Sequence, residues 1–275
     1  MQKITSTNFK PCEVIPLQWV RTLSEGANKP MLIRGIDQNR QQTGDFVLKY
    51  RNAERMNETT CRRELLAAWM AIEMDIAVPE PVIIEVDSNF VATVPRELQP
   101  IMTSKALGLN IGSRYISGNA TFQPAPTLPP ELHQTAARIF AFDLMLQNAD
   151  RRDEKPNSFL AEGKIYVYDH ELSFGFLSML PMFANQTPWV MNETDVSSAK
   201  NHLFYPALSQ ISSVNWEAAL STLSHLNPVF WQRAAELMPN EWVDAQEMTR
   251  IQAHIDAIQQ YSSVFISEIC NKLIG

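Results

Sequence analysis

Residues 131–147 are apolar on nearly every side, and the polar stretch NADRRDEKPN follows them without a break. Such a segment does not suit a surface helix, which keeps one polar face. We therefore expect a helix in the centre of a helical region, which would hold the next residues on a rigid support. Those residues place Asp150, Asn157 and Asp169 around the strand-like run IYVYD.

The composition restricts the class of protein. With 275 residues, 45% of them hydrophobic, the chain is long enough for one large domain or two lobes. Its 23 basic and 30 acidic residues give a formal charge of −7, which disfavours a nucleic acid as a direct partner. The cysteines Cys12, Cys61 and Cys270 are far apart, so no zinc site or disulfide framework is indicated. Because a signal segment and a long apolar run are both missing, we expect a cytoplasmic protein with no membrane contact.

The first hundred residues predict two hairpins around a helix. The runs at 31–36 and 45–50 predict one hairpin, and the runs at 81–86 and 90–94 predict a second. Between them, Leu65, Trp69, Ile72 and Ile76 recur at helical spacing. Residues 103–130, rich in Gly, Ser, Asn and Pro, predict a loop that crosses to the next lobe.

The remaining chain predicts one short hairpin and several helices. The hairpin turns at Glu162 and Gly163, and the clearest helical patterns cover 215–226, 228–237 and 242–273. We expect an α+β fold with two lobes, a β-rich lobe at 1–102 and a helical lobe at 103–275. A cleft between such lobes is the expected ligand site.

Phosphoryl transfer needs a cation for the nucleotide phosphates and a carboxylate that holds this cation. Lys49 ends the strand FVLKY, where alternation sets it on the face opposite Phe46 and Leu48. Glu64, in the next helix, is able to pair with it. The alternatives are a solvated strand lysine and an ordinary exposed helix glutamate beside Arg62 and Arg63.

The same chemistry needs a base and metal ligands. Asp150 directly follows the buried helix and is a candidate to accept a hydroxyl proton. Asn157 and Asp169 offer the oxygen ligands that magnesium prefers. The alternative is that all three cap helices or close turns, as such residues commonly do in loops. His170 and Glu171 could orient Asp169.

Other motifs narrow the choice. The chain has no GxSxG elbow, no Walker sequence and no GxGxxG turn, which disfavours the hydrolases and nucleotide folds that use them. The turn GIDQNRQQTG, bounded by Gly35 and Gly44, is a candidate to cover phosphates with backbone N–H groups. Asp143, inside the apolar helix, is expected to pair with Arg151 or Arg138 rather than to perform chemistry.

The sequence resembles the HipA-like branch of the kinase fold, which is distantly similar to the phosphoinositide kinases. The resemblance covers most of the chain and rests on these blocks: FVLKYR, RELLAAWMAIEMDIAVPEP, IGSRY, FAFDLMLQNADRRDEKPNSFL and IYVYDHELSF. It implies Lys49 as the phosphate-contacting lysine, Glu64 as its partner and Asp150 as the catalytic aspartate. It also implies ATP and Mg²⁺ as cofactors, with Asn157 and Asp169 as the metal ligands.

The resemblance also implies a hinge that grips adenine after the run FVATV, at 94–98, and Glu97 is the candidate contact there. Three features depart from the protein-kinase pattern. The spacing from Asp150 to Asn157 is two residues longer than in HRDxxxxN, no His-Arg pair precedes Asp150, and His170 replaces the phenylalanine of DFG.

Two functional hypotheses follow from the residues and the resemblance. The first is an ATP- and Mg²⁺-dependent phosphotransferase that acts on Ser or Thr of a protein substrate. The second is a catalytically weak or inactive pseudokinase that binds nucleotide or docks a regulatory protein partner. A lipid kinase is a third hypothesis, and the charge of −7 offers no attraction to an anionic membrane.

Overall fold

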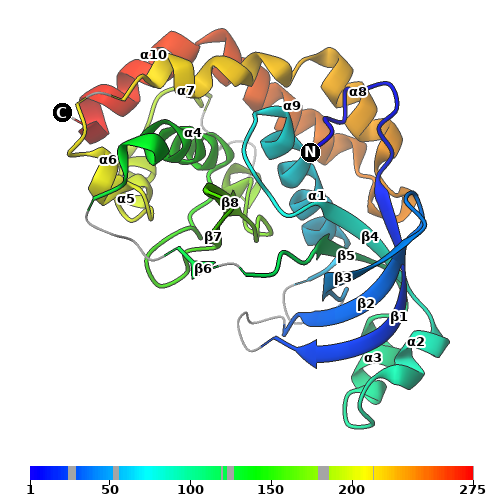
Figure 1. The fold of residues 1–275 in the computed structure, drawn as a ribbon. Coiled ribbons are helices and arrows are strands. Elements are labelled where there is room, and N and C mark those ends of the chain that lie inside the picture. The colour runs from blue at the N-terminus through cyan, green and yellow to red at the C-terminus, as the bar shows by residue number, and fades with distance from the viewer. Residues whose placement is uncertain are drawn as a thin grey trace.

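Strands and helices are segregated in the protein, as the α+β prediction requires. The computed structural model describes residues 1–23, 29–51, 56–118, 120–122, 127–178, 186–212 and 214–274. Figure 1 shows a β barrel at one end of the molecule and a group of helices at the other. The α+β class predicted from the sequence is confirmed.

The β-rich end is a closed barrel with the strand order β1-β2-β3-β5-β4. Its strands are β1 (Cys12–Thr22), β2 (Met31–Asp37), β3 (Gln42–Lys49), β4 (Pro81–Val86) and β5 (Gly108–Arg114). Neighbours are antiparallel except β1 and β4, which pair in parallel at Cys12–Val14. The predicted hairpin at 31–50 is confirmed as β2 and β3, whereas β1 was not predicted.

The barrel is filled by every second side chain of its strands. Val14, Ile33, Phe46, Leu48 and Ile84 are all buried in one apolar cluster. Alternation along β3 therefore turns Val47 and Lys49 to the opposite face, as the sequence pattern indicated.

Two glycines allow the strands to approach one another closely. A Cβ on Gly35 would lie 2.6 Å from Cγ1 of Val14, and one on Gly112 would lie 2.5 Å from the carbonyl oxygen of Val47. Gly35 pairs directly with Gly44 in the β2–β3 ladder. The packing of the barrel therefore explains why a side chain is missing at Gly35.

Helix α1 (Glu58–Glu73) packs against the barrel and confirms the predicted helix. Asn57 accepts a hydrogen bond from the backbone N–H of Thr60, and the Thr60 side chain accepts one from the N–H of Asn57. This reciprocal cap fixes where the helix begins. Leu65, Leu66 and Trp69 are buried, because the helix packs between the barrel and the C-terminal helices.

The second predicted hairpin is wrong, because the run FVATV lies in helix α2 (Ser88–Thr93). Asp87 caps this helix by accepting the N–H of Phe90 at 2.8 Å, and Phe90 and Val91 pack into the barrel core. Helix α3 (Gln99–Lys105) follows, and Figure 1 shows both helices at the end of the barrel opposite the C-terminal helices.

The true partner of β4 is β5. It lies within the predicted crossover loop and beyond the predicted boundary at residue 102. Pairing with β3 and β4 makes residues 108–114 part of the barrel.

Helix α4 (Pro130–Leu146) is the centre of the helical part, as the sequence predicted. Ile139, Phe140 and Phe142 have no exposed surface. A small sheet of β6 (Ala120–Thr121), β7 (Ser158–Ala161) and β8 (Lys164–Val167) follows the order β6-β7-β8. The hairpin predicted at Glu162 and Gly163 is confirmed as the β7–β8 turn.

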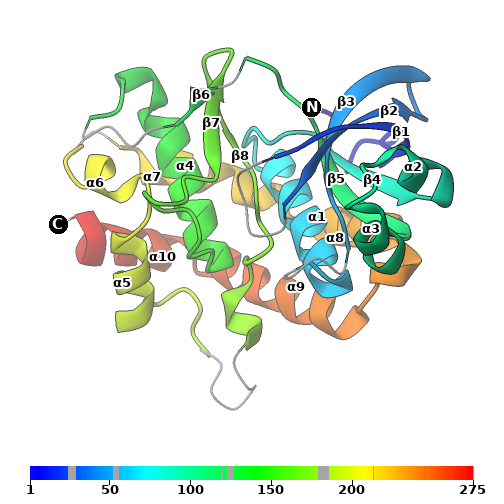
Figure 2. The same cartoon turned by 90° about the horizontal axis from the view of Figure 1, so that it is seen from below.

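Helices complete the chain, as predicted. They are α5 (Glu193–Lys200), α6 (Tyr205–Leu208), α7 (Trp216–Leu220), α8 (Pro228–Leu237), α9 (Ala245–Gln260) and α10 (Ser262–Ile269). The pattern predicted at 242–273 is divided at Tyr261, where α9 ends. In Figure 2, α10, α9 and α8 follow one another across the molecule, from the C-terminus to the side of the barrel. Within the described part of the chain, no helix has the length and apolar character needed to cross a membrane.

Candidate active site

A cleft of about 750 Å³ lies between the barrel and the helical part. The barrel contributes Lys49 from β3 and the residues 112–116 at the end of β5, and α1 contributes Glu64. The helical part contributes 153–157 before β7 and 167–171 after β8. The polar segments on either side of the β7–β8 hairpin therefore line one side of the cleft, and Lys49 of β3 lies opposite them.

Lys49 lies between two carboxylates. Its Nζ is 2.9 Å from Oε1 of Glu64 and 2.7 Å from Oδ1 of Asp169. Burial alone would lower the pKa of Lys49, but the charges of Asp169 and Glu64 outweigh burial and raise it. Lys49 is therefore a fixed cation at neutral pH.

The carboxylates around Lys49 respond in different ways. Burial tends to raise the pKa of Asp169, but Lys49 more than offsets this, and the pKa is lowered. Burial raises the pKa of Glu64 despite Lys49. Burial, followed by the charge of Asp169, also raises the pKa of Glu171 to about 7. Asp169 is thus the carboxylate held most firmly in the charged form that a metal ion requires.

The register of the β7–β8 hairpin brings the two expected metal ligands together. Ser158 pairs with Val167, so Asn157 comes opposite Tyr168, whose N–H donates to the Asn157 carbonyl at 3.0 Å. Asp169 is the next residue. Asn157 and Asp169 have φ of +42° and +61°, a left-handed conformation that Asn and Asp tolerate better than most residues. An amide and a carboxylate at one end of a hairpin fit the hard oxygen ligands of Mg²⁺.

Asp150 lies directly behind this pair and is only 5% exposed. Its Oδ2 is 3.2 Å from Nζ of Lys155 and 3.4 Å from Nδ2 of Asn157. Lys155 and Asn157 line the cleft, whereas Asp150 is not among the lining residues. The Asp150 carboxylate is therefore reached from the cleft past these two side chains.

The sequence profile of HipA-like kinases matches residues 17–265, which is most of the chain. The chain belongs to the HipA-like kinase family. Its membership supports a function of the kinase or pseudokinase type. No curated protein matches this HipA-like kinase.

Solved structures that the chain is similar to include the following three. The proinflammatory kinase CtkA of Helicobacter pylori is 11% identical, with a TM-score of 0.47 and 97% of each chain covered. The PAN3 pseudokinase of Neurospora crassa is 11% identical, with a TM-score of 0.33, covering 95% of this chain and 68% of that one. A MAP kinase of Leishmania major is 11% identical, with a TM-score of 0.30, covering 91% of this chain and 82% of that one.

Three nucleotide contacts expected from the sequence of this HipA-like kinase lie away from the cleft. Gly35 and Gly44 face each other in the β2–β3 ladder and are not lining residues. Glu97 is exposed in the turn between α2 and α3, because the run before it forms a helix rather than the strand that would lead to a hinge. The structure therefore leaves these three positions outside the lining of the cleft.

Other segments of the barrel line the cleft. Arg21, Leu23 and Pro30, at the ends of β1 and β2, line the cleft, and residues 24–28 between them lie outside the described residues. Tyr115 and Ile116 line it after β5. The block IGSRY, residues 111–115, covers the end of β5, and the alternation of Leu109 with Ile111 was the available signal for a strand there.

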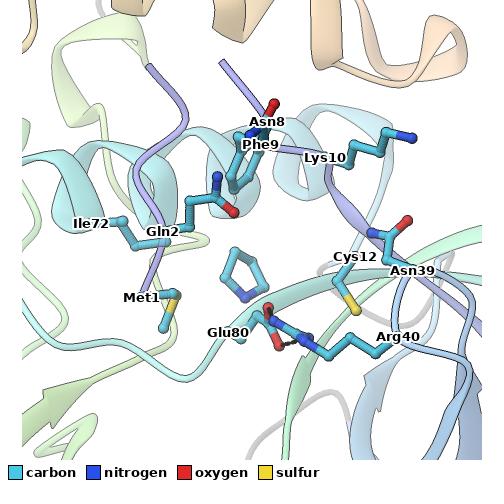
Figure 3. A pocket seen from close by; sticks show the side chains of 11 residues that line it. Met1, Gln2, Asn8, Phe9, Lys10, Cys12, Asn39, Arg40, Ile72 and Glu80 are labelled. Carbon is cyan, nitrogen blue, oxygen red and sulfur yellow. Dashed lines mark hydrogen bonds and ion pairs between the residues drawn. The ribbon is translucent and has the colours of Figure 1, made fainter. Parts of the chain in front are cut away.

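A second hollow of about 290 Å³ lies where the N-terminal segment meets the barrel. Figure 3 shows Phe9, Lys10, Cys12, Arg40, Ile72 and Glu80 around it. Here Cys12, Asp37 and Glu80 place possible metal-ligand atoms within 4.8 Å of one another.

Two guanidinium groups already occupy this cluster. Arg40 lies 2.7 Å from both Asp37 and Glu80, and Arg114 lies 2.7 Å from Glu80. Burial raises the pKa of the Cys12 thiol to about 12, so it is not a thiolate. The cluster is therefore a network of ion pairs within the barrel rather than a metal centre.

Proposed function

We propose that this HipA-like kinase is an ATP- and Mg²⁺-dependent phosphotransferase that acts on a Ser or Thr hydroxyl of a protein. The observation that carries the proposal is the position of Lys49, whose Nζ joins Glu64 and Asp169 at 2.9 and 2.7 Å in the cleft. A kinase site needs such a cation beside a metal-binding carboxylate. The barrel and the helical part then act as two lobes with the nucleotide between them.

Each side chain has a role in this proposal. Lys49 binds the nucleotide phosphates, and Glu64 holds Lys49 in place. Asn157 and Asp169 would hold the magnesium ion, which neutralises charge on the phosphates when bound. Backbone groups at 115–116, directly after β5, are in the position to bind adenine.

The transfer itself requires only positioning and one proton acceptor. The substrate hydroxyl oxygen forms a bond to the γ-phosphorus while the bond from this phosphorus to the bridging oxygen breaks, and ADP leaves with that electron pair. The hydroxyl proton passes to the Asp150 carboxylate. Lys155, 3.2 Å from Asp150, adds positive charge next to the transferred group.

A pseudokinase is the second candidate, and the surroundings of Asp150 favour it. Lys155 and Asn157 both contact Oδ2 of Asp150, and Asp150 does not line the cleft. In this alternative the cleft binds nucleotide, with or without metal, and the protein acts by docking a partner.

Thermal unfolding with ATP, with and without Mg²⁺, tests the metal–nucleotide site on the wild type and on Asp169→Ala. Ligand at 100 times Kd stabilises a protein by about 2.7 kcal/mol, which gives a readily visible shift. We expect a Mg²⁺-dependent shift in the wild type that Asp169→Ala loses. A wild type without any shift would contradict the proposal.

Transfer of labelled γ-phosphate to the protein itself or to a mixed protein substrate separates the two candidates. Transfer that Asp150→Ala abolishes supports the phosphotransferase. A Mg²⁺-dependent thermal shift without any turnover supports the pseudokinase.

A further inference from the structure

Arg151 follows the proposed catalytic aspartate and has no exposed surface. Burying an arginine costs free energy unless its N–H donors have hydrogen-bond acceptors. The acceptors of Arg151 therefore indicate its role. Nε lies 2.6 Å from Oδ2 of Asp143, and one terminal nitrogen lies 3.3 Å from Oδ1 of the same carboxylate. This two-point contact anchors the guanidinium to helix α4.

The remaining terminal nitrogen of Arg151 faces the proposed metal ligands. It donates to the carbonyl oxygen of Asn157 and, at 3.4 Å, to that of Tyr168. Asn157 is one expected ligand, and Tyr168 directly precedes the other, Asp169. One planar group therefore joins the backbone at both ligand positions to a single carboxylate in the central helix.

The same carboxylate also fixes the backbone of Asp150. Nδ2 of Asn148 donates to Asp143 at 2.8 Å, and Oδ1 of Asn148 accepts the N–H of Asp150 at 3.2 Å. Nε2 of His202 completes the set at 3.0 Å from Asp143. Nδ1 of His202 accepts the N–H of Phe204, so the proton is on Nε2 and points at Asp143.

We propose that Arg151 is a positioning residue that sets the distance of Asn157 and Asp169 from Asp150, and so sets the affinity of the site for Mg²⁺–nucleotide. The inference rests on the proposed function. We call Asp143, Asn148, Arg151 and His202 the Asp143 bracket. Its carboxylate contacts the groups that hold Asp150, and its guanidinium contacts the backbone at the metal ligands.

Two further observations favour positioning over a purely structural role. Asn157 and Asp169 both have left-handed backbone conformations, which persist only where neighbours hold them. The acceptors of the free end of Arg151 are the carbonyls at these ligand positions, at the edge of the cleft, rather than groups in the apolar core. A lysine at this position keeps the charge but cannot contact the carboxylate and both carbonyls together.

Titration calorimetry with a non-hydrolysable ATP analogue, in EDTA and in Mg²⁺, tests the inference. The quantity of interest is the magnesium gain, the ratio of Kd without and with the metal. Residues that orient metal ligands change metal affinity by about tenfold or more, so we expect Arg151→Lys to reduce the gain by about tenfold. The Kd in EDTA should not change, because Lys49 and the adenine site are untouched.

Arg62→Lys is the matched control. Arg62 is also buried and also paired with a carboxylate, Glu247 at 3.0 Å, and with a carbonyl, that of Trp242 at 2.8 Å. None of these groups lines the cleft. Arg62→Lys should lose stability and keep the wild-type magnesium gain.

The outcomes separate the inference from the proposed function. Folded Arg151→Lys with a wild-type gain would overturn the positioning role and leave the proposed function standing. A wild type without any magnesium gain would overturn both. If Arg151→Lys does not fold, His202→Gln, which weakens the same bracket, is measured in the same way. The same reduction is expected, and an unchanged gain would overturn the inference.

Discussion

Two clusters of charged side chains contact the same barrel, and they differ in their balance of charge. Beside the N-terminal segment, Arg40 and Arg114 meet Asp37 and Glu80, so two cations face two carboxylates. Every charge there has a partner of opposite sign. The geometry resembles a metal site, with Cys12 as a third potential ligand, and yet an added cation would have to displace an arginine.

The cluster in the cleft is not balanced. Among the described residues, Lys49 pairs with both Glu64 and Asp169, Lys155 also attracts Asp169, and Glu171 lies close enough for Asp169 to raise its pKa. In these ion pairs one cation faces two carboxylates, an excess of negative charge that a divalent cation would relieve. Proximity of acidic groups is therefore a poor guide to a metal site, and the charge that remains uncompensated is a better one.

Lys49→Met has the largest expected effect because it removes the cation between two half-buried carboxylates. Breaking a buried ion pair by removing one partner costs about 3 kcal/mol or more of the free energy of unfolding. Urea denaturation measures this loss. Arg40→Met, in the balanced cluster, should cost less, because Glu80 keeps Arg114. Equal losses in the two variants would contradict the difference between the clusters.

Asp37→Asn tests the balanced cluster by removing a negative charge instead of a positive one. Burial alone would raise the pKa of Asp37, but hydrogen bonds from Arg40 and other neighbours lower it to about 2. The carboxylate therefore stabilises the fold above its ordinary pKa of about 3.8, and this stability is lost as pH falls from about 4 to 2.

We expect Asp37→Asn to lose about 2 kcal/mol at pH 7, and to lose less than the wild type on further acidification. Urea denaturation at pH 7 and at steps from pH 5 to 2.5 measures both effects. The magnesium gain should stay at the wild-type value. A reduced magnesium gain would mean that the barrel cluster affects the metal–nucleotide site.

Local patterns predicted much of the fold. The hairpin of β2 and β3, helices α1 and α4, and the β7–β8 hairpin all follow from periodicity and turn residues. The run FVATV was misassigned because its apolar residues Phe90, Val91 and Val94 suit either a strand or a short helix. The helix forms because Asp87 caps its N-terminus and because Phe90 and Val91 pack into the barrel core.

The candidate site divides along the same line. Lys49, Glu64 and Asp169 meet because each lies on an element that the sequence indicated, and the Asp143–Arg151 pair was predicted and is confirmed. The pairing of β4 with β5 was missed because two helices separate these strands, and strand pairing over that distance leaves little local signal. Strand packing accounts for Gly35, and the sequence alone does not distinguish a glycine required by packing from one that binds phosphate.

His170 differs from both charged clusters, since within the described chain neither of its ring nitrogens has a hydrogen-bond partner. Burial lowers the pKa of His170 to about 3, so the ring is neutral. It meets Phe142 edge-on, with ring centroids 6.1 Å apart. A buried polar group without a partner costs about 1 kcal/mol or more, so we expect His170→Phe to stabilise the protein by about 1 kcal/mol.

His254→Phe is the matched control for this smallest effect. His254 is a half-buried histidine whose pKa is also lowered by burial, to about 4. Its Nε2 is 3.0 Å from the carbonyl oxygen of Met145, however, and its ring stacks on Phe176 at 3.7 Å. His254→Phe removes the donor from a carbonyl, so it should destabilise the protein in the same urea assay. If both variants lost stability, His170 would have a partner in solution, and its ring would be a polar contact rather than a substitute for the phenylalanine of other kinases.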